Sequence, residues 1–115
     1  MNKIYILKKE ITASYITYHI KVNGQQLAVK FTHHAIERAK TWELSEQEVL
    51  KALVFPDEVI TGHGQRFIAH KCKNSKVIRV IYEYRENIPV IITVYVPQRA
   101  RYYQGGGAYA DKILP

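Results

Sequence analysis

The alternation of apolar and polar positions predicts strands in the first third of the chain. Residues 15–22 and 26–31 are rich in β-branched and aromatic side chains, as expected of strands. Asn23 and Gly24 lie between these segments and favour a two-residue type I′ turn, since both tolerate a positive φ. We therefore expect an antiparallel hairpin, preceded by a further strand at residues 3–9.

At Thr32 the period changes to that of a helix. Thr32 is a suitable N-cap for a helix whose apolar face consists of Ala35, Ile36, Ala39 and Trp42. Residues 45–48, with the sequence SEQE, have the spacing of a capping box and predict the start of a second helix. Pro56 ends this helix, because the residue before a proline is pushed out of the helical region.

Strands are expected again after Pro56, at residues 58–61, 66–71, 77–84 and 89–96, with turn-forming residues between them. Beyond residue 103 the periodicity is lost, and three consecutive glycines at 105–107 cost too much conformational entropy for the interior of an element. The sequence predicts one α+β domain at residues 1–103 and a Gly-rich, flexible tail at residues 104–115. Its antiparallel sheet, a hairpin plus a four-strand meander, carries two consecutive helices on one face.

The charge balance favours a polyanionic partner. Seventeen Lys and Arg against ten Asp and Glu give a formal net charge of +7 and a pI near 9.5. Such a positive field attracts nucleic acid, which is the leading partner. Two alternatives stay open: a surface tuned for solubility, and a surface neutralised by an acidic protein.

Several classes of protein are disfavoured. The longest apolar runs are far shorter than the roughly 20 residues needed to cross a bilayer, and charges at residues 8–10 interrupt any secretory signal. A single cysteine, Cys72, excludes an intrachain disulfide and a Cys-rich zinc cage. The histidines form no H-x-x-x-H pair, and no phosphate-binding loop of the type GxxxxGK[ST] is present. We expect a cytoplasmic protein without membrane, metal or cofactor.

His34 and Arg38 are candidates for chemistry. They lie four residues apart, on one stripe of the first expected helix beside its apolar face. An imidazole can exchange a proton near neutral pH, and a guanidinium can hold a phosphate through two parallel hydrogen bonds. The alternative is that His34 supports the first helical turn and Arg38 is a solvated surface residue.

Arg79 is the third catalytic candidate. Period two puts it with Arg85 on one face of the strand at 77–84, and an arginine in mid-strand is harder to dismiss than one at a turn. The alternative is a pair between Arg79 and a carboxylate such as Glu83. Cations bind phosphates and rings stack on bases, so a mixture of basic and aromatic residues suits RNA. The candidate RNA-binding residues are Arg66, His70, Lys71, Arg85, Arg99, Arg101, Tyr102 and Tyr103.

Residues 31–103 resemble a family of small uncharacterised prokaryotic domains close to the BrnT and RelE toxins. The likeness rests on FTHHAIERAKTWELSEQEVLKALVFPDEVI, then GQRF, VIRVIYEY and PVIITVYVPQRARYY, in that order. It implies a β-α-α-β-β-β core with helices on one face of the sheet and an RNA groove on the other. The residues with motif matches are His34, Arg38, Arg66 and Arg79. The opening hairpin and the Gly-rich end are departures from the minimal domain.

Toxins of this type cut RNA without a metal, often messenger RNA on the ribosome, and are silenced by a cognate antitoxin, here expected to be acidic. The sequence hypothesis is therefore a metal-independent endoribonuclease. His34 would exchange the proton, Arg38, Arg79 and Arg99 would neutralise the phosphate, and Tyr102 or Tyr103 would stack a base or assist proton transfer. The alternatives are a non-catalytic nucleic-acid-binding or regulatory module, and an accessory protein with an acidic partner.

Overall fold

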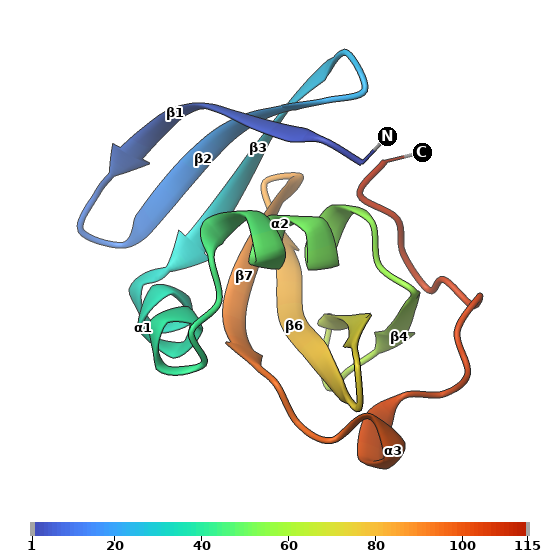
Figure 1. The fold of residues 1–115 in the computed structure, drawn as a ribbon. Helices are drawn as coiled ribbons and strands as arrows, with labels where there is room; N and C mark the ends of the chain where they lie inside the picture. The colour runs from blue at the N-terminus through green and yellow to red at the C-terminus, as the bar shows by residue number, and fades with distance from the viewer. Residues whose placement is uncertain (1, 115) are drawn as a thin grey trace.

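The computed structural model describes residues 2–114 and has an α+β fold built on one seven-stranded sheet (Figure 1). The strand order is β1-β2-β3-β7-β6-β5-β4. The strands are β1 (Ile4–Ile11), β2 (Tyr15–Val22), β3 (Gln25–Thr32), β4 (Glu58–Thr61), β5 (Phe67–Lys73), β6 (Lys76–Arg85) and β7 (Ile88–Tyr95). The helices are α1 (His33–Thr41), α2 (Glu46–Val54) and α3 (Arg99–Tyr102). No helix of the described chain is long and apolar enough to span a membrane.

The sheet is mixed, so the prediction of a purely antiparallel sheet is wrong at one pair of strands. β1, β2 and β3 form one antiparallel meander, and β4 to β7 form a second. The two meanders join where β3 runs parallel to β7, at Lys30 opposite Val90 and Phe31 opposite Ile91. Turn sequences determine only how consecutive strands pair, whereas this junction joins strands separated by two helices and three strands.

The local signals in the sequence are confirmed. Asn23 and Gly24 have φ of 49° and 79°, as a type I′ turn requires. The Thr32 hydroxyl accepts a hydrogen bond from the Ala35 N–H at 3.0 Å and caps α1. The capping box of α2 is complete, and this helix ends at Val54, two residues before Pro56.

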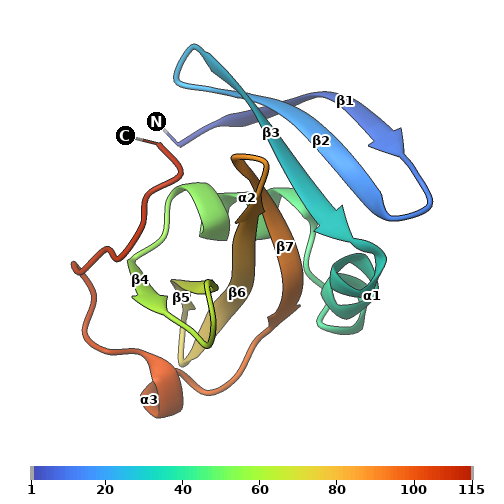
Figure 2. The same ribbon diagram turned by 180° about the vertical axis from the view of Figure 1, so that it is seen from behind.

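The main core lies between α2 and the sheet. α2 packs on β5 and β6, while α1 lies beside β7 and β3. Figure 2 shows the molecule from behind, where α3 lies at the lower end of the β4–β7 meander. The expected apolar face of α1 is only partly right: Ala35 and Ala39 are buried, but Trp42 is 37% exposed. α1 ends at Thr41, so Trp42 is its C-cap and leaves the helical stripe.

The C-terminal segment is packed against the body rather than free. It runs beside β4 (Figure 1), and the Val59 N–H donates to the Ala108 carbonyl while the Ala110 N–H donates to the Val59 carbonyl, at 3.0 and 2.8 Å. The hydroxyls of Tyr82 and Tyr84 both donate to the Asp111 carboxylate at 2.7 Å. This differs from the flexible tail predicted for residues 104–115. Besides these polar contacts, Ile113 and Leu114 pack against the core, and such isolated contacts leave no apolar period in the sequence.

Candidate functional site

A row of polar side chains crosses the β4–β7 meander. Glu58 of β4 is opposite His70 of β5, His70 is opposite Arg79 of β6, and Arg79 is opposite Tyr95 of β7. Residues directly opposite one another project from the same face of a sheet. The next residues along these strands belong to the core under α2, so the row lies on the face that α2 does not cover.

A β-bulge in β7 puts this strand in register with the row. Tyr82 is opposite Ile91 but Ile81 is opposite Thr93, so Ile92 is an extra residue. The Ile92 carbonyl accepts a hydrogen bond at 2.9 Å from the hydroxyl of the threonine that caps α1. One extra residue reverses which face the rest of a strand presents. Without it, the tyrosine at the end of β7 would turn away from the row.

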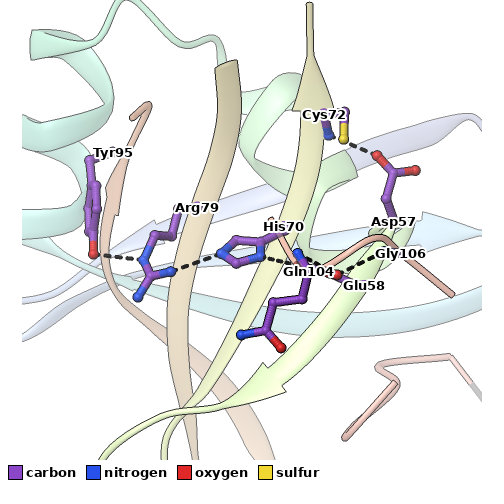
Figure 3. Close-up of polar contacts among 8 residues, drawn as sticks. All are labelled: Asp57, Glu58, His70, Cys72, Arg79, Tyr95, Gln104 and Gly106. Atoms are coloured by element: carbon purple, nitrogen blue, oxygen red, sulfur yellow. Dashed lines mark hydrogen bonds and ion pairs between the residues drawn. The ribbon is translucent and has the colours of Figure 1, made fainter. Parts of the chain in front are cut away.

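The four side chains form a continuous hydrogen-bonded chain (Figure 3). Arg79 Nε donates to the Tyr95 hydroxyl at 2.7 Å, and Arg79 Nη1 lies 3.0 Å from His70 Nε2. His70 Nδ1 lies 2.6 Å from Glu58 Oε2. A guanidinium can only donate, so His70 Nε2 must accept and Nδ1 must carry the proton that is donated to Glu58. The chain therefore holds a carboxylate, a neutral imidazole and a guanidinium.

The C-terminal segment supplies further donors to Glu58. The backbone N–H of Gln104 donates to Oε2 at 2.9 Å, and that of Gly106 donates to Oε1 at 3.0 Å. Burial raises the pKa of Glu58, but the hydrogen bonds from His70, Gln104 and Gly106 outweigh it, and the net pKa is lowered. Glu58 is 1% exposed and is a buried, fully hydrogen-bonded anion.

His70 cannot contact RNA directly in this structure, because its exposure is 0%. Burial lowers its pKa and the Arg79 charge lowers it further, while the contact with Glu58 opposes both; the net pKa is lowered. This agrees with the neutral tautomer required by the hydrogen bonds. His70 was predicted as an RNA-binding residue, but its position is that of a link between the Glu58 carboxylate and the Arg79 guanidinium.

Arg79 and Tyr95 are the members of the row that are not buried, and Arg79 carries the charge. It is partly exposed, and its guanidinium carbon lies 4.2 Å from the ring centroid of Tyr102 in α3. Two of the five N–H donors of the guanidinium are used by Tyr95 and His70, and three remain. An open depression of ≈ 490 Å³ adjoins it. The lining residues are Ile60, Thr61, Gly62, His63, Arg66, Ile68, Arg79, Ile81 and Tyr95.

Two further arginines near this depression share one carboxylate. Arg66 Nε donates to Glu83 Oε1 at 3.0 Å, and Arg85 Nε donates to Glu83 Oε2 at 2.9 Å. The expected alternative, a pair between Arg79 and Glu83, does not occur among the described contacts. Because one carboxylate neutralises only one of two guanidinium groups, this end of the face remains positive.

His34, another of the predicted catalytic residues, approaches the same face from α1. His34 Nε2 lies 3.3 Å from the Thr93 hydroxyl, and Thr93 is two residues before Tyr95 on β7. Residues two apart on a strand share a face and lie roughly 7 Å apart. The structure thus brings His34 to the face that carries Arg79. Arg38 lies one turn further along α1 and is partly buried.

Two of the predicted RNA-binding residues lie away from the row. Lys71 points to the opposite face, where its Nζ donates to the Phe55 carbonyl at 2.9 Å. Arg85 is at the end of β6 and donates to the Tyr15 hydroxyl as well as to Glu83. The alternation of side chains along β5 separates Lys71 from its neighbour in the row.

The residues predicted after β7 are near the row. Tyr102 covers the Arg79 guanidinium, and the Tyr103 ring centroid is 6.5 Å from that of His70. Arg99 and Arg101 are exposed on α3. α3 therefore borders the face with aromatic and basic groups.

Glu58 and Tyr95 were not predicted as site residues. Two-residue turns join β5 to β6 and β6 to β7, and their positive φ values at Asn74, Glu86 and Asn87 fix the register next to each turn. Counting from the first turn would have placed His70 opposite Arg79. Counting residue pairs from the second turn would not have placed Tyr95 opposite Arg79, since the bulge shifts β7 by one residue.

Comparison with known proteins identifies a family. No curated protein and no solved structure matches the chain. Residues 31–96 match the family described as a domain of unknown function (DUF4258). The matched segment contains α1 and the whole polar row, whereas the C-terminal segment that contacts Glu58 lies outside it. Because the match covers more than half of the 115 residues, the chain belongs to the DUF4258 family.

Proposed function

We propose that this protein is a metal-independent endoribonuclease of the RelE/BrnT toxin type, which cleaves RNA in the cytoplasm. The observation that carries the proposal is the Arg79 guanidinium. It is hydrogen-bonded to the buried His70, which is itself bonded to the buried Glu58, and it adjoins an open depression beside the Tyr95 hydroxyl. Three of its N–H donors have no partner within residues 2–114. A guanidinium fixed in this way can meet a phosphate without losing further side-chain entropy.

The reaction needs only groups on the RNA and on this face. The 2′-oxygen attacks the adjacent phosphorus, an oxygen–phosphorus bond forms, and the bond from phosphorus to the 5′-oxygen breaks. The proton of the 2′-hydroxyl passes to a base, for which His34 is proposed, and the hydroxyl of Tyr102, whose ring lies beside Arg79, is proposed to deliver another proton to the leaving 5′-oxygen. Arg79 stabilises the added negative charge, with Arg38 as a second cation. The products are a 2′,3′-cyclic phosphate and a free 5′-hydroxyl.

The arrangement of elements supports the likeness to RelE and BrnT. β3, α1, α2 and then β4 to β7 follow one another along the chain, which is the order of the β-α-α-β-β-β core that the likeness implies with one additional strand. α2 covers one face of the second meander, and the polar row lies on the other. The ribosome and an acidic antitoxin remain proposed partners on the strength of this likeness.

The test is cleavage of end-labelled RNA by the purified protein in EDTA. We expect cutting that leaves a cyclic phosphate end, and a loss of about a hundredfold or more in single-turnover rate for His34→Ala or Arg38→Ala. The thermal midpoint should hardly change, because both residues flank the buried stripe of α1 rather than lie in it. Lys51→Ala, which removes an exposed cation from α2, is the matched control. Full cleavage by both variants would show that α1 does not contribute to the active site.

A second function, RNA binding without cleavage, is favoured by one observation. The His34 imidazole contacts the Thr93 hydroxyl at 3.3 Å and has no carboxylate partner among the described contacts to orient it as a base. A binding module would retain labelled RNA in the same assay without cutting it. Its affinity would still fall steeply with salt, since each neutralised phosphate releases counterions.

A further inference from the structure

A second, apolar row lies beside the polar row on the same face. Ile60 of β4 is opposite Ile68 of β5, Ile68 is opposite Ile81 of β6, and Ile81 is opposite Thr93 of β7. Each member is two residues from a member of the polar row, so both rows project to the same side of the sheet. α2 does not cover this side of the sheet. A side that faced only water would be expected to carry polar residues, so the apolar row needs another explanation.

The apolar row forms the floor of the depression beside Arg79. Ile60 and Ile81 are partly exposed there, and Ile68 lies beneath them with 7% exposure. The connection from β4 to β5 forms one wall, closed by a hydrogen bond of 2.8 Å from the Gly62 N–H to the Arg66 carbonyl. A Cβ at Gly62 would lie 3.3 Å from Ile68 Cδ1, so the glycine lets this wall approach the floor closely.

The rim of the depression is cationic and polar. Arg79 and Tyr95 stand on the side of the polar row, and His63 and Arg66 stand on the opposite wall. The volume of ≈ 490 Å³ is within the range of about 300–1,000 Å³ that holds small molecules. A flat apolar floor with donors at its ends suits a ligand that has a planar apolar part and an anionic part.

We propose that this depression is a nucleotide subsite for single-stranded RNA, with one unpaired base on the floor of Ile60, Ile68 and Ile81 and the adjacent phosphate on Arg79. This proposal rests on the proposed function and adds that the site accepts RNA as a single strand rather than as a duplex. The two rows are roughly 7 Å apart, so one nucleotide spans them. A base in a duplex has both faces stacked on its neighbours and cannot lie on the floor, whereas an unpaired base can.

The apolar floor beside Arg79 favours nucleic acid over an acidic peptide as the occupant. The free donors of Arg79 match either a phosphate or a carboxylate, but the apolar floor directly beside them needs a flat partner at a fixed distance from the anion. A nucleotide supplies both in one rigid unit. An acidic peptide supplies the charge alone.

The experiment compares three ligands of equal length that cannot be cut: a single strand with 2′-O-methyl groups, the same strand with all bases removed, and the duplex. Fluorescence anisotropy should give at least about tenfold tighter binding of the base-bearing single strand than of the other two, because only its unpaired bases can bury apolar surface on the floor. Ile81→Ser and Ile60→Thr should abolish this preference and keep the affinity for the abasic strand. Leu7→Ser, which changes an exposed leucine on β1, should keep the preference. Two variants on different strands guard against one that fails to fold.

The outcomes separate this inference from the proposed function. Equal affinity for the base-bearing and abasic strands, with both lost in Arg79→Ala, overturns the subsite and leaves the phosphate contact standing. Competition by polyglutamate as strong as by the single strand also overturns it, in favour of an acidic peptide. Binding of none of the three ligands overturns both proposals.

Discussion

The two faces of the β4–β7 meander have opposite characters, although they are built from alternate residues of the same strands. The face under α2 presents Val59, Ala69 and Val80, all at most 2% exposed. One residue away along each strand, the other face presents Glu58, His70 and Arg79. The first face therefore contributes stability alone, whereas the second contributes stability through its buried polar groups and also carries the proposed chemistry. Substitutions at two adjacent residues, one on each face, should therefore show which face carries the chemistry.

The largest expected effect is on cleavage by Arg79→Ala compared with Val80→Ala. Loss of the guanidinium should lower the single-turnover rate by about a hundredfold or more. It should also lower stability by about 1–3 kcal/mol, because the buried His70 loses its donor. Val80→Ala should lower the free energy of unfolding by about 2 kcal/mol through a core cavity, and leave the rate unchanged well below its thermal midpoint. Chemical denaturation and RNA cleavage on both variants measure the two effects. A normal rate for Arg79→Ala would show that the polar face does not carry the chemistry.

The next effect in size is that of Glu58→Gln. The carboxylate accepts hydrogen bonds from His70 and from two backbone N–H groups, and each is charge-assisted. An amide removes the charge and turns an NH₂ group toward one of these donors, so we expect a loss of about 2–3 kcal/mol in the free energy of unfolding. Glu86→Gln, at an exposed turn, is the control and should behave as the native protein. Stability unaltered by Glu58→Gln would mean that the row is not held by its buried anion.

A smaller effect should come from Gly106→Ala, with Gly107→Ala as its matched control. Both glycines have positive φ, of 82° and 80°, so alanine costs about 1–2 kcal/mol at either position. A Cβ at Gly106 would also collide with the Tyr103 hydroxyl, whereas a Cβ at Gly107 meets open space. Gly106→Ala should therefore be the more destabilising by about 1 kcal/mol or more, as overpacking usually is. Equal thermal midpoints would show that the C-terminal segment is not docked on Glu58 in solution.

The smallest effect concerns pH. The pKa of His70 is lowered in the folded protein, so below about pH 6.5 the unfolded chain binds more protons at this residue than the folded one. The contribution of His70 to the free energy of unfolding is therefore complete above that pH. It decreases as the pH falls toward the lowered pKa of His70 in the folded protein. The thermal midpoint should decrease from pH 7 to pH 5, and this slope should flatten in His70→Gln but persist in His63→Gln, whose side chain is exposed. The lowered pKa of Glu58 adds a further loss at pH values below about 4.5. An unchanged slope in His70→Gln would contradict a neutral, buried imidazole.

The sequence by itself determined the elements that depend on neighbouring residues. The turn at Asn23 and Gly24, the cap at Thr32 and the capping box of α2 each involve groups within four residues, and a local pattern specifies them. The sequence also selected His34 and Arg79 as site residues from their types and spacing. It could not give His70 its role, because the burial of this residue depends on the chain segments that cover it.

The site itself was decided by tertiary structure. The polar row requires four strands in one register, and the alignment of Tyr95 with Arg79 requires an extra residue at Ile92, whose carbonyl is bound from the start of α1. The two backbone donors to Glu58 come from residues more than 40 positions away in the sequence. Contacts at such separation leave no periodicity and no motif in the sequence. They depend on how whole elements pack and on which unpaired strand edge a later segment can reach. For this reason the sequence could propose His34 and Arg79 as candidates, whereas the chain of hydrogen bonds from Glu58 to Arg79 became visible only in the folded chain.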